Sequence, residues 1–260
     1  MENTHKELLD WIEEQIAGPR PTGDLLNKAP NLTDADAYRL QFALMKRLAA
    51  RGDRLIGYKA AYTSQAMQKE RGMPGPIIGS LLQSGLFDES KPIPLLPDFK
   101  TMVEPEVAVL LKHDLAGPGI TASAALRAVE GIFPAMEIAG QSVNAPKRSR
   151  QMGIAIHKTS GGIVVGGPMC SAHGIDLRLE GMVISINGVV RGSATGVEVM
   201  GNPLNLVATI ANTLGEYGET LKAGMVLMTG SIVSALPVAP GDDVNIEFTR
   251  LGRVTARFVA

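Results

Sequence analysis

Apolar residues recur at the spacing of an α-helix in four parts of the chain. Two lie near the N-terminus and predict amphipathic helices over residues 5–17 and 33–51. The hydroxyl of Thr33 suits the start of the second helix, because its oxygen can accept a hydrogen bond from the first turn. The other two helices are expected over residues 121–131 and from residue 202 onward.

From residue 55 the pattern changes to short apolar runs separated by glycine and proline, which predicts β-strands. Strands are expected over residues 55–64, 103–111, 132–139, 161–167, 182–186, 189–191, 225–228, 232–236, 244–248 and 254–258. Asn187-Gly188 predicts a tight hairpin turn between two of them. Residues 65–80 and 140–153 are expected to be loops, and the first is rich enough in glycine and proline to serve as a lid. The pattern predicts an α+β protein that begins with a small helical unit.

The run at 103–111 places two acids on one face of a strand. Alternate residues of a strand point the same way, so Glu104 and Glu106 project together with their Cα atoms about 7 Å apart. The surrounding valines and leucines indicate a buried strand, in which two ionised carboxylates need a compensating cation. Two interpretations remain open. One is a divalent cation site, which needs a third acid, and the other is a solvated strand end whose glutamates pair with surface lysines.

Two further charges interrupt apolar runs. Glu137 is the only charge in the run 132–139 and supplies the third acid that a cation site needs. Lys59 is the only charge in the run 55–64. It is either a lysine that keeps its ammonium group in solvent, or one that faces the glutamates and moves protons. His157 is likewise either a structural residue or an acid/base group.

Composition narrows the classes of function. The 260 residues are 45% hydrophobic and 20% charged with a net charge of −1, which is typical of a globular protein with a substantial core. No basic stripe is present and aromatic residues are 4%, so a small molecule is a better expectation than nucleic acid. The polar N-terminus and the short apolar runs predict no signal peptide, no membrane span and a cytoplasmic location. Cys170 is the one cysteine, which excludes an internal disulfide.

Five short motifs follow one another along the chain: Gly57-Tyr58-Lys59, Glu104-Pro105-Glu106, Met136-Glu137-Ile138, Gly201-Asn202-Pro203-Leu204-Asn205 and Gly224-Met225-Val226-Leu227-Met228-Thr229-Gly230-Ser231. Together they resemble the 2-keto-4-pentenoate hydratase and 4-oxalocrotonate decarboxylase group of the fumarylacetoacetate hydrolase superfamily. The resemblance covers almost the whole chain, including the N-terminal helical unit. Each motif alone would be a weak signal, whereas the spaced acids with the Thr-Gly-Ser strand are fairly specific.

The resemblance implies a twisted, mostly antiparallel β-roll with flanking helices. It divides the chain into a small helical or mixed unit at 1–75 and a catalytic domain at 76–260. Lys59 matches the lysine that the family places near its substrate. The implied cofactor is a divalent cation, Mg²⁺ or Mn²⁺, whose ligands would be Glu104, Glu106 and Glu137. The strand that contacts the substrate carboxylate in the family matches Thr229, Gly230 and Ser231.

The implied activity is hydration of a 2-hydroxy-dienoate, or of its 2-oxo-enoate tautomer, in the breakdown of an aromatic compound. The cation would polarise the 2-oxo group, and Lys59 could shuttle protons. Two alternatives use the same site, namely decarboxylation of a 2-oxo-3-enedioate and hydrolytic carbon–carbon cleavage of an acylpyruvate. A catalytically silent relative that binds a small dicarboxylate is a third, although the complete set of lysine and three acids favours catalysis.

The chain departs from the family pattern at two places. Ile138-Ala139-Gly140-Gln141 replaces an Ile/Val-Asp-Ser/Ala-Arg run, and Ile156-His157-Lys158-Thr159-Ser160 stands where relatives have Asp-Asn-Ala. A carboxylate is lost and two basic residues are gained, which predicts an altered substrate or altered proton delivery. His157 is therefore a candidate catalytic residue and Lys158 a candidate substrate contact. The resemblance further implies a homo-oligomer and a complex with another enzyme of the same pathway.

Overall fold

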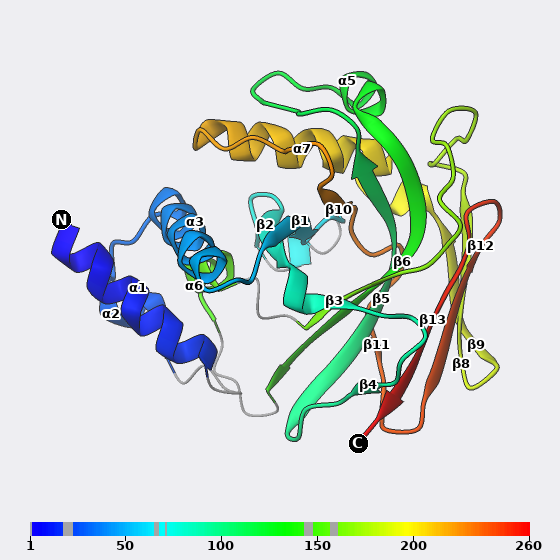
Figure 1. Ribbon diagram of the computed structural model, residues 1–260, viewed down its shortest axis with the longest axis horizontal. Coiled ribbons are helices and arrows are strands. Elements are labelled where there is room, and N and C mark those ends of the chain that lie inside the picture. Colours follow the sequence, from blue (N-terminus) through cyan, green and yellow to red (C-terminus); the bar gives the residue numbers. More distant parts are fainter. Residues whose placement is uncertain (1, 18–22, 65–67, 71, 143–147, 157–160) are drawn as a thin grey trace.

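The computed structural model describes residues 2–17, 23–64, 68–70, 72–142, 148–156 and 161–260 as two β-sheets with helices packed around them (Figure 1). The helices are α1 (Glu2–Ala17), α2 (Leu25–Lys28), α3 (Asp34–Ala50), α5 (Ala122–Arg127), α6 (Arg150–Ala155) and α7 (Pro203–Glu216), with short 3-10 helices at Gln83–Gly85 and Gly196–Glu198. In the described part of the chain, none of these helices is long and apolar enough to cross a membrane.

The larger sheet has eight strands, and its path is β2-β1-β10-β5-β6-β7-β3 with β11 paired to β5. These strands are β1 (Leu55–Ala61), β2 (Ile77–Leu82), β3 (Leu86–Phe87), β5 (Phe99–Leu111), β6 (Val129–Ser142), β7 (Gly162–Val165), β10 (Val226–Met228) and β11 (Leu236–Pro237). The long strands β5 and β6 form the central antiparallel pair and are visible as the tall green ribbons of Figure 1. β5 also pairs with β10 and β11, and β6 also pairs with β7, so this pair links the two sides of the sheet.

The smaller sheet has five strands in the order β4-β13-β12-β8-β9. They are β4 (Ile93–Pro94), β8 (Gly181–Ile186), β9 (Val189–Thr195), β12 (Asp243–Phe248) and β13 (Gly252–Val259). Pairing is antiparallel except between β1 and β10, β3 and β7, and β4 and β13. The α+β class and the mostly antiparallel arrangement expected from the sequence are confirmed.

One large apolar core joins the two sheets and α7. It includes Val103 and Val107 from β5, Ile246 from β12 and Leu206 from α7, all fully or almost fully buried. The valines belong to the face of β5 that looks away from Glu104 and Glu106, because the side chains of a strand alternate. The apolar half of the 103–111 pattern therefore fixes the orientation in which β5 presents its acids to the other side.

The N-terminal helices pack on the larger sheet through a second core, at the left of Figure 1. Leu9 and Ile12 of α1 and Leu44 of α3 meet Leu82 of β2 and Met152 of α6 in this core. The amphipathic patterns of α1 and α3 are thus explained by burial, and the two expected helices are present. That they form a separate unit stays a prediction. Its expected boundary at residue 75 stays a prediction.

The local capping signals are confirmed. The Thr33 side chain accepts a hydrogen bond from the Asp36 amide, and Asp36 accepts one from the Thr33 amide, which closes a capping box at the start of α3. Asn202 caps α7 with Pro203 in its first turn. At the β8–β9 hairpin, Asn187 has φ 54° and Gly188 has φ 74°, which the Asn-Gly pair accommodates.

Several expected element boundaries are wrong, because tertiary contacts extend or create elements. Residues 77–80 belong to β2 and not to a loop, since Ile77 and Ile78 are buried and pair with β1. The expected loop at 140–153 contains the end of β6 and the first four residues of α6, whose first turn is capped by Ser149. The expected helix at 121–131 ends at Arg127, because β6 begins two residues later. The strand expected at 232–236 is reduced to β11, Leu236–Pro237.

Gln41 of α3 connects the helical unit to the rest of the chain and provides a test of this packing. Its fully buried amide donates to the carbonyls of Ile78 and Ile154 and accepts from Ser80 Oγ. We expect Gln41→Ala to lower the free energy of unfolding by about 2 kcal/mol, because buried polar groups lose their partners. Urea unfolding measures this change. The exposed Gln83→Ala is the control, and a loss below about 0.5 kcal/mol for Gln41→Ala would contradict the prediction.

Candidate metal centre

The strand register brings three carboxylates together. Glu104 of β5 lies directly opposite Glu137 of β6, and Glu106 lies two residues further along the same face of β5. One ligand oxygen from each of the three residues lies within 4.8 Å of the others. The third acid that the cation interpretation requires is therefore supplied by the neighbouring strand.

Burial makes this arrangement costly while the carboxylates are ionised. Glu106 is 1% exposed and Glu137 is 4% exposed. Burial, followed by the charge of Glu137, raises the pKa of Glu104 to about 7, while Lys59 opposes this rise. Burial likewise raises the pKa of Glu106 well above its ordinary value, reinforced by the charges of Glu137 and Glu104. The interpretation of the glutamates as a solvated strand end is thus wrong.

Lys59 reaches the same place from another strand. It lies on β1, which pairs with β10, which in turn pairs with β5. The Lys59 ammonium forms an ion pair with Glu137 Oε1, and both side chains are almost fully buried. The interpretation of a lysine that keeps its charge in solvent is wrong. Gly57 makes the approach of β1 to β10 feasible, because a Cβ at that position would lie 1.7 Å from the Val226 carbonyl oxygen.

The segment after β10 completes one side of the site. The Gly230 amide donates a 2.7 Å hydrogen bond to Glu106 Oε2. The Thr229 hydroxyl donates to the Val107 carbonyl, and the Ser231 hydroxyl donates to the Val233 carbonyl. Of these three bonds, the one from Gly230 reaches a carboxylate, and the predicted contact of this segment with a substrate stays a prediction.

A divalent cation fits the carboxylate cluster. Among the described residues, Glu106 Oε1 is a buried oxygen without a hydrogen-bond partner. A buried, unpaired carboxylate oxygen is unfavourable, whereas Mg²⁺ and Mn²⁺ take oxygen ligands of this kind. An apolar cluster that includes Leu81, Ala108 and Met228 lies beside the carboxylates. Apolar surroundings strengthen the attraction between the carboxylates and a cation.

Two candidate residues from the sequence lie outside the described residues. They are His157 and Lys158, so their predicted roles are neither supported nor opposed. Conversely, sequence reasoning assigned no role to Thr63, whose side chain the structure places against Gly230. The only local signal was its position near the end of the run that contains Lys59, and such a contact between distant segments leaves no pattern in the sequence.

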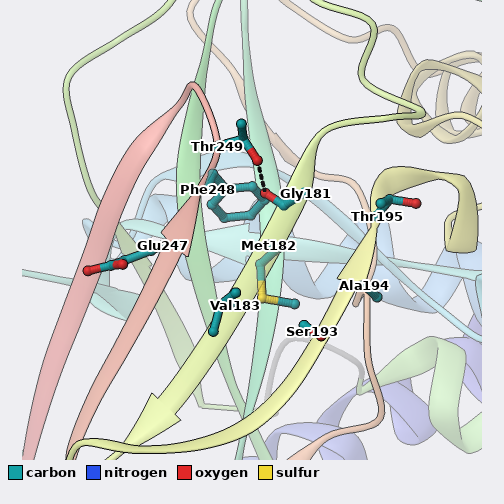
Figure 2. Close-up of a pocket in the computed structure, with 9 residues that line it drawn as sticks. All are labelled: Gly181, Met182, Val183, Ser193, Ala194, Thr195, Glu247, Phe248 and Thr249. Carbon is teal, nitrogen blue, oxygen red and sulfur yellow. Dashed lines mark hydrogen bonds between the residues drawn. The ribbon is translucent and has the colours of Figure 1, made fainter.

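A separate groove of about 450 Å³ lies on the smaller sheet (Figure 2). Its wall is formed by β8, β9 and β12 and the adjoining turn, and in Figure 2 the Thr249 hydroxyl bonds the Gly181 carbonyl. The lining residues include Met182, Val183, Ser193, Thr195, Glu247 and Phe248. Glu247 is the one carboxylate among them and it is exposed, so this groove lacks the convergent charges of the β5–β6 face.

The family assignment follows from the match of this chain to known proteins. The family model for the fumarylacetoacetate (FAA) hydrolase C-terminal region matches residues 55–259, which contain every carboxylate of the cluster and Lys59. The chain belongs to the fumarylacetoacetate hydrolase family.

Relatives within this family include both a decarboxylase and a hydratase. The chain is 36% identical to the 4-oxalocrotonate decarboxylase of Pseudomonas putida over 97% of this chain and 96% of the relative. It is 32% identical to the 2-hydroxyhexa-2,4-dienoate hydratase of Comamonas testosteroni over 95% of this chain and 94% of the relative. Among solved structures, 4-oxalocrotonate decarboxylase from Pseudomonas putida G7, complexed with calcium and acetate, matches with a TM-score of 0.90 and 32% identity, covering 100% of this chain and 98% of that chain.

The structure shows where this chain departs from the family pattern at Ala139, the position at which relatives have an aspartate. Ala139 follows Glu137 by two residues on β6 and pairs with Met102, so it lies on the face of the sheet that carries the carboxylates. An aspartate at this position would place a fourth carboxylate on that face. Alanine adds no carboxylate at this position, and the altered substrate or proton delivery expected from the sequence stays a prediction.

The raised pKa of Glu104 predicts how stability depends on pH without metal. Glu104 has a pKa of about 7 in the folded protein against an ordinary 4.5, so the native state holds this proton more tightly than the unfolded state. The resulting stabilisation is complete below pH 4.5 and is lost as the pH rises through about 7. We expect the melting temperature of chelator-treated wild type to fall relative to Glu104→Gln across this range. Saturating Mn²⁺ should remove the loss. If the difference in melting temperature between wild type and Glu104→Gln stayed constant with pH, the raised pKa of Glu104 would be contradicted.

Proposed function

We propose that this protein is a divalent-metal-dependent hydratase that adds water to a 2-hydroxy-dienoate or its 2-oxo-enoate tautomer in aromatic-compound catabolism. The observation that carries the proposal is the convergence of Lys59 with three glutamates, two of them buried, on one face of the β5–β6 pair. Relatives named as hydratases, such as the 2-keto-4-pentenoate hydratase of Paraburkholderia xenovorans at 30% identity, support it. The reaction class is that of a hydro-lyase.

The residues of this chain have distinct tasks in such a reaction. Glu104, Glu106 and Glu137 would hold the cation, which when bound polarises the 2-oxo group of the substrate. Lys59 Nζ lies at Glu137, where it is placed to give and take the proton that moves to the carbon chain during ketonisation. Water then forms the new carbon–oxygen bond at the β carbon of the enone, one bond beyond the α carbon. The proton that water loses is balanced by a proton delivered to the α carbon, which gives a 4-hydroxy-2-oxo acid.

Thr229, Gly230 and Ser231 are the proposed contacts for the substrate carboxylate. They follow β10 directly and border Glu106, so a carboxylate held there would lie next to the cation ligands. His157 and Lys158 are proposed as the residues that adapt proton delivery and substrate choice in this chain. A kinetic comparison of His157→Ala with wild type tests that assignment.

Decarboxylation of a 2-oxo-3-enedioate is the second candidate. It is favoured by the 36% identity to 4-oxalocrotonate decarboxylase and by the TM-score of 0.88 to that enzyme complexed with magnesium and adipate, a dicarboxylate. Both reactions need the same polarised 2-oxo group, and they differ in whether water is added or carbon dioxide leaves.

The cation is proposed to be Mg²⁺ or Mn²⁺. The enzyme is proposed to work in the cytoplasm as a homo-oligomer, in complex with another enzyme of its pathway.

Turnover of two substrates separates these candidates. We expect 2-hydroxypenta-2,4-dienoate to be consumed in the presence of Mg²⁺ or Mn²⁺, as followed by ultraviolet absorbance, and the reaction to stop after chelation or in Glu106→Gln. Preferential consumption of 2-oxo-3-hexenedioate with release of carbon dioxide would favour the decarboxylase. Metal binding without turnover of either compound would contradict both and favour a binding role.

Lys59→Met tests proton transfer separately from metal binding. We expect kcat to fall by about 100-fold or more, because the acid/base group is lost. The affinity for Mn²⁺ should stay the same or increase, because a positive charge beside Glu137 is removed. Lys112→Met is the matched control, since Lys112 pairs with Glu130 at the surface. A Lys59→Met enzyme that retains a kcat near that of the control would exclude this role.

A further inference from the structure

Thr63 lies two residues beyond the strand that carries Lys59, and its side chain covers Gly230. A Cβ atom at Gly230 would lie 2.5 Å from Thr63 Oγ1 and 2.7 Å from Thr63 Cγ2, so no other residue fits beneath this threonine. Thr63 is itself 7% exposed. Two segments that are far apart in the sequence are therefore in close van der Waals contact beside the carboxylate cluster.

Gly230 is held in a conformation that matters for Glu106. Its φ of 95° belongs to the left-handed region that favours glycine. In this conformation its amide donates to Glu106 Oε2, whereas Glu106 Oε1 has no hydrogen-bond partner among the described residues. The two oxygens of Glu106 are thus distinguished, because one is held by the backbone and the other is left for a cation.

The chain approaches Thr63 through an unusual backbone conformation. Tyr62 has a φ of 60°, which is uncommon for an aromatic residue. Its carbonyl accepts a 2.7 Å hydrogen bond from the Gln68 side chain. Strained residues of this kind persist only where the surrounding structure fixes them, and they cluster at functional sites.

We propose that Thr63 is a positioning residue for the cation ligand Glu106: by packing on Gly230 it fixes the amide that holds Oε2 and leaves Oε1 to the metal. This inference rests on the proposed function, because it assumes that Glu106 binds a divalent cation. Packing by the whole side chain is responsible, since the Thr63 hydroxyl makes no hydrogen bond to another described residue. Removing this contact loosens the Gly230 amide and with it the orientation of Glu106.

The test compares Thr63→Ala with Thr63→Val. Calorimetric titration with Mn²⁺ in the absence of substrate gives the dissociation constant of each full-length protein. We expect Thr63→Ala to weaken Mn²⁺ binding by about tenfold, as is typical when the support of a metal ligand is removed. Thr63→Val keeps the packing volume and should bind within about twofold of wild type, because the lost hydroxyl makes no hydrogen bond to another described residue. Thr63→Ser loses only Cγ2 and should weaken Mn²⁺ binding less than Thr63→Ala does. If Thr63→Ala does not fold, Thr63→Ser takes its place in the comparison.

Two results would overturn the inference. Mn²⁺ binding by folded Thr63→Ala equal to that of wild type would show that Gly230 needs no support. A loss in Thr63→Val as large as that in Thr63→Ala would assign the effect to the hydroxyl and not to packing. Glu106→Gln is measured beside them and should weaken Mn²⁺ binding strongly. If Glu106→Gln also binds Mn²⁺ like wild type, the proposed metal site is wrong. That result differs from one in which only the Thr63 variants bind like wild type, which would exclude the role of Thr63 alone.

Discussion

The crowding of three carboxylates, two of them buried, on one face of an antiparallel strand pair is the constraint on which the rest of this structure depends. Glu104, Glu106 and Glu137 are too close together and too shielded from water to remain ionised without compensation. Lys59 compensates part of their charge, and Glu106 Oε1, which has no hydrogen-bond partner among the described residues, is available to a cation. The fold maintains an unfavourable cluster that metal binding would relieve.

The surrounding architecture holds this cluster in place from several directions. The opposite face of β5 is anchored in the large core by its valines, so the acids cannot rotate away without exposing apolar surface. Parallel pairing of β1 with β10 delivers Lys59, and the segment after β10 returns to hold Glu106 through the Gly230 amide. The N-terminal helices brace β2 and α6 on the far side of β1.

Isolated charges inside apolar runs were enough to single out Glu104, Glu106, Glu137 and Lys59 from the sequence, because strand periodicity alone puts the first two on one face. The register that places Glu137 opposite Glu104 is a property of two strands, and no single run encodes it. Likewise α6, the extension of β6 and the contact of Thr63 with Gly230 depend on tertiary packing. Sequence reasoning therefore identified the charged groups but not what orients them.

Anomalous diffraction from crystals soaked in Mn²⁺ would test the central claim most directly. The account predicts one strong peak between the three glutamates, with an oxygen of each at about 2.2 Å and Glu106 bound through Oε1 while Oε2 still accepts the Gly230 amide. Absence of a peak there, with Mn²⁺ bound elsewhere and Lys59 alone facing the three acids, would contradict it.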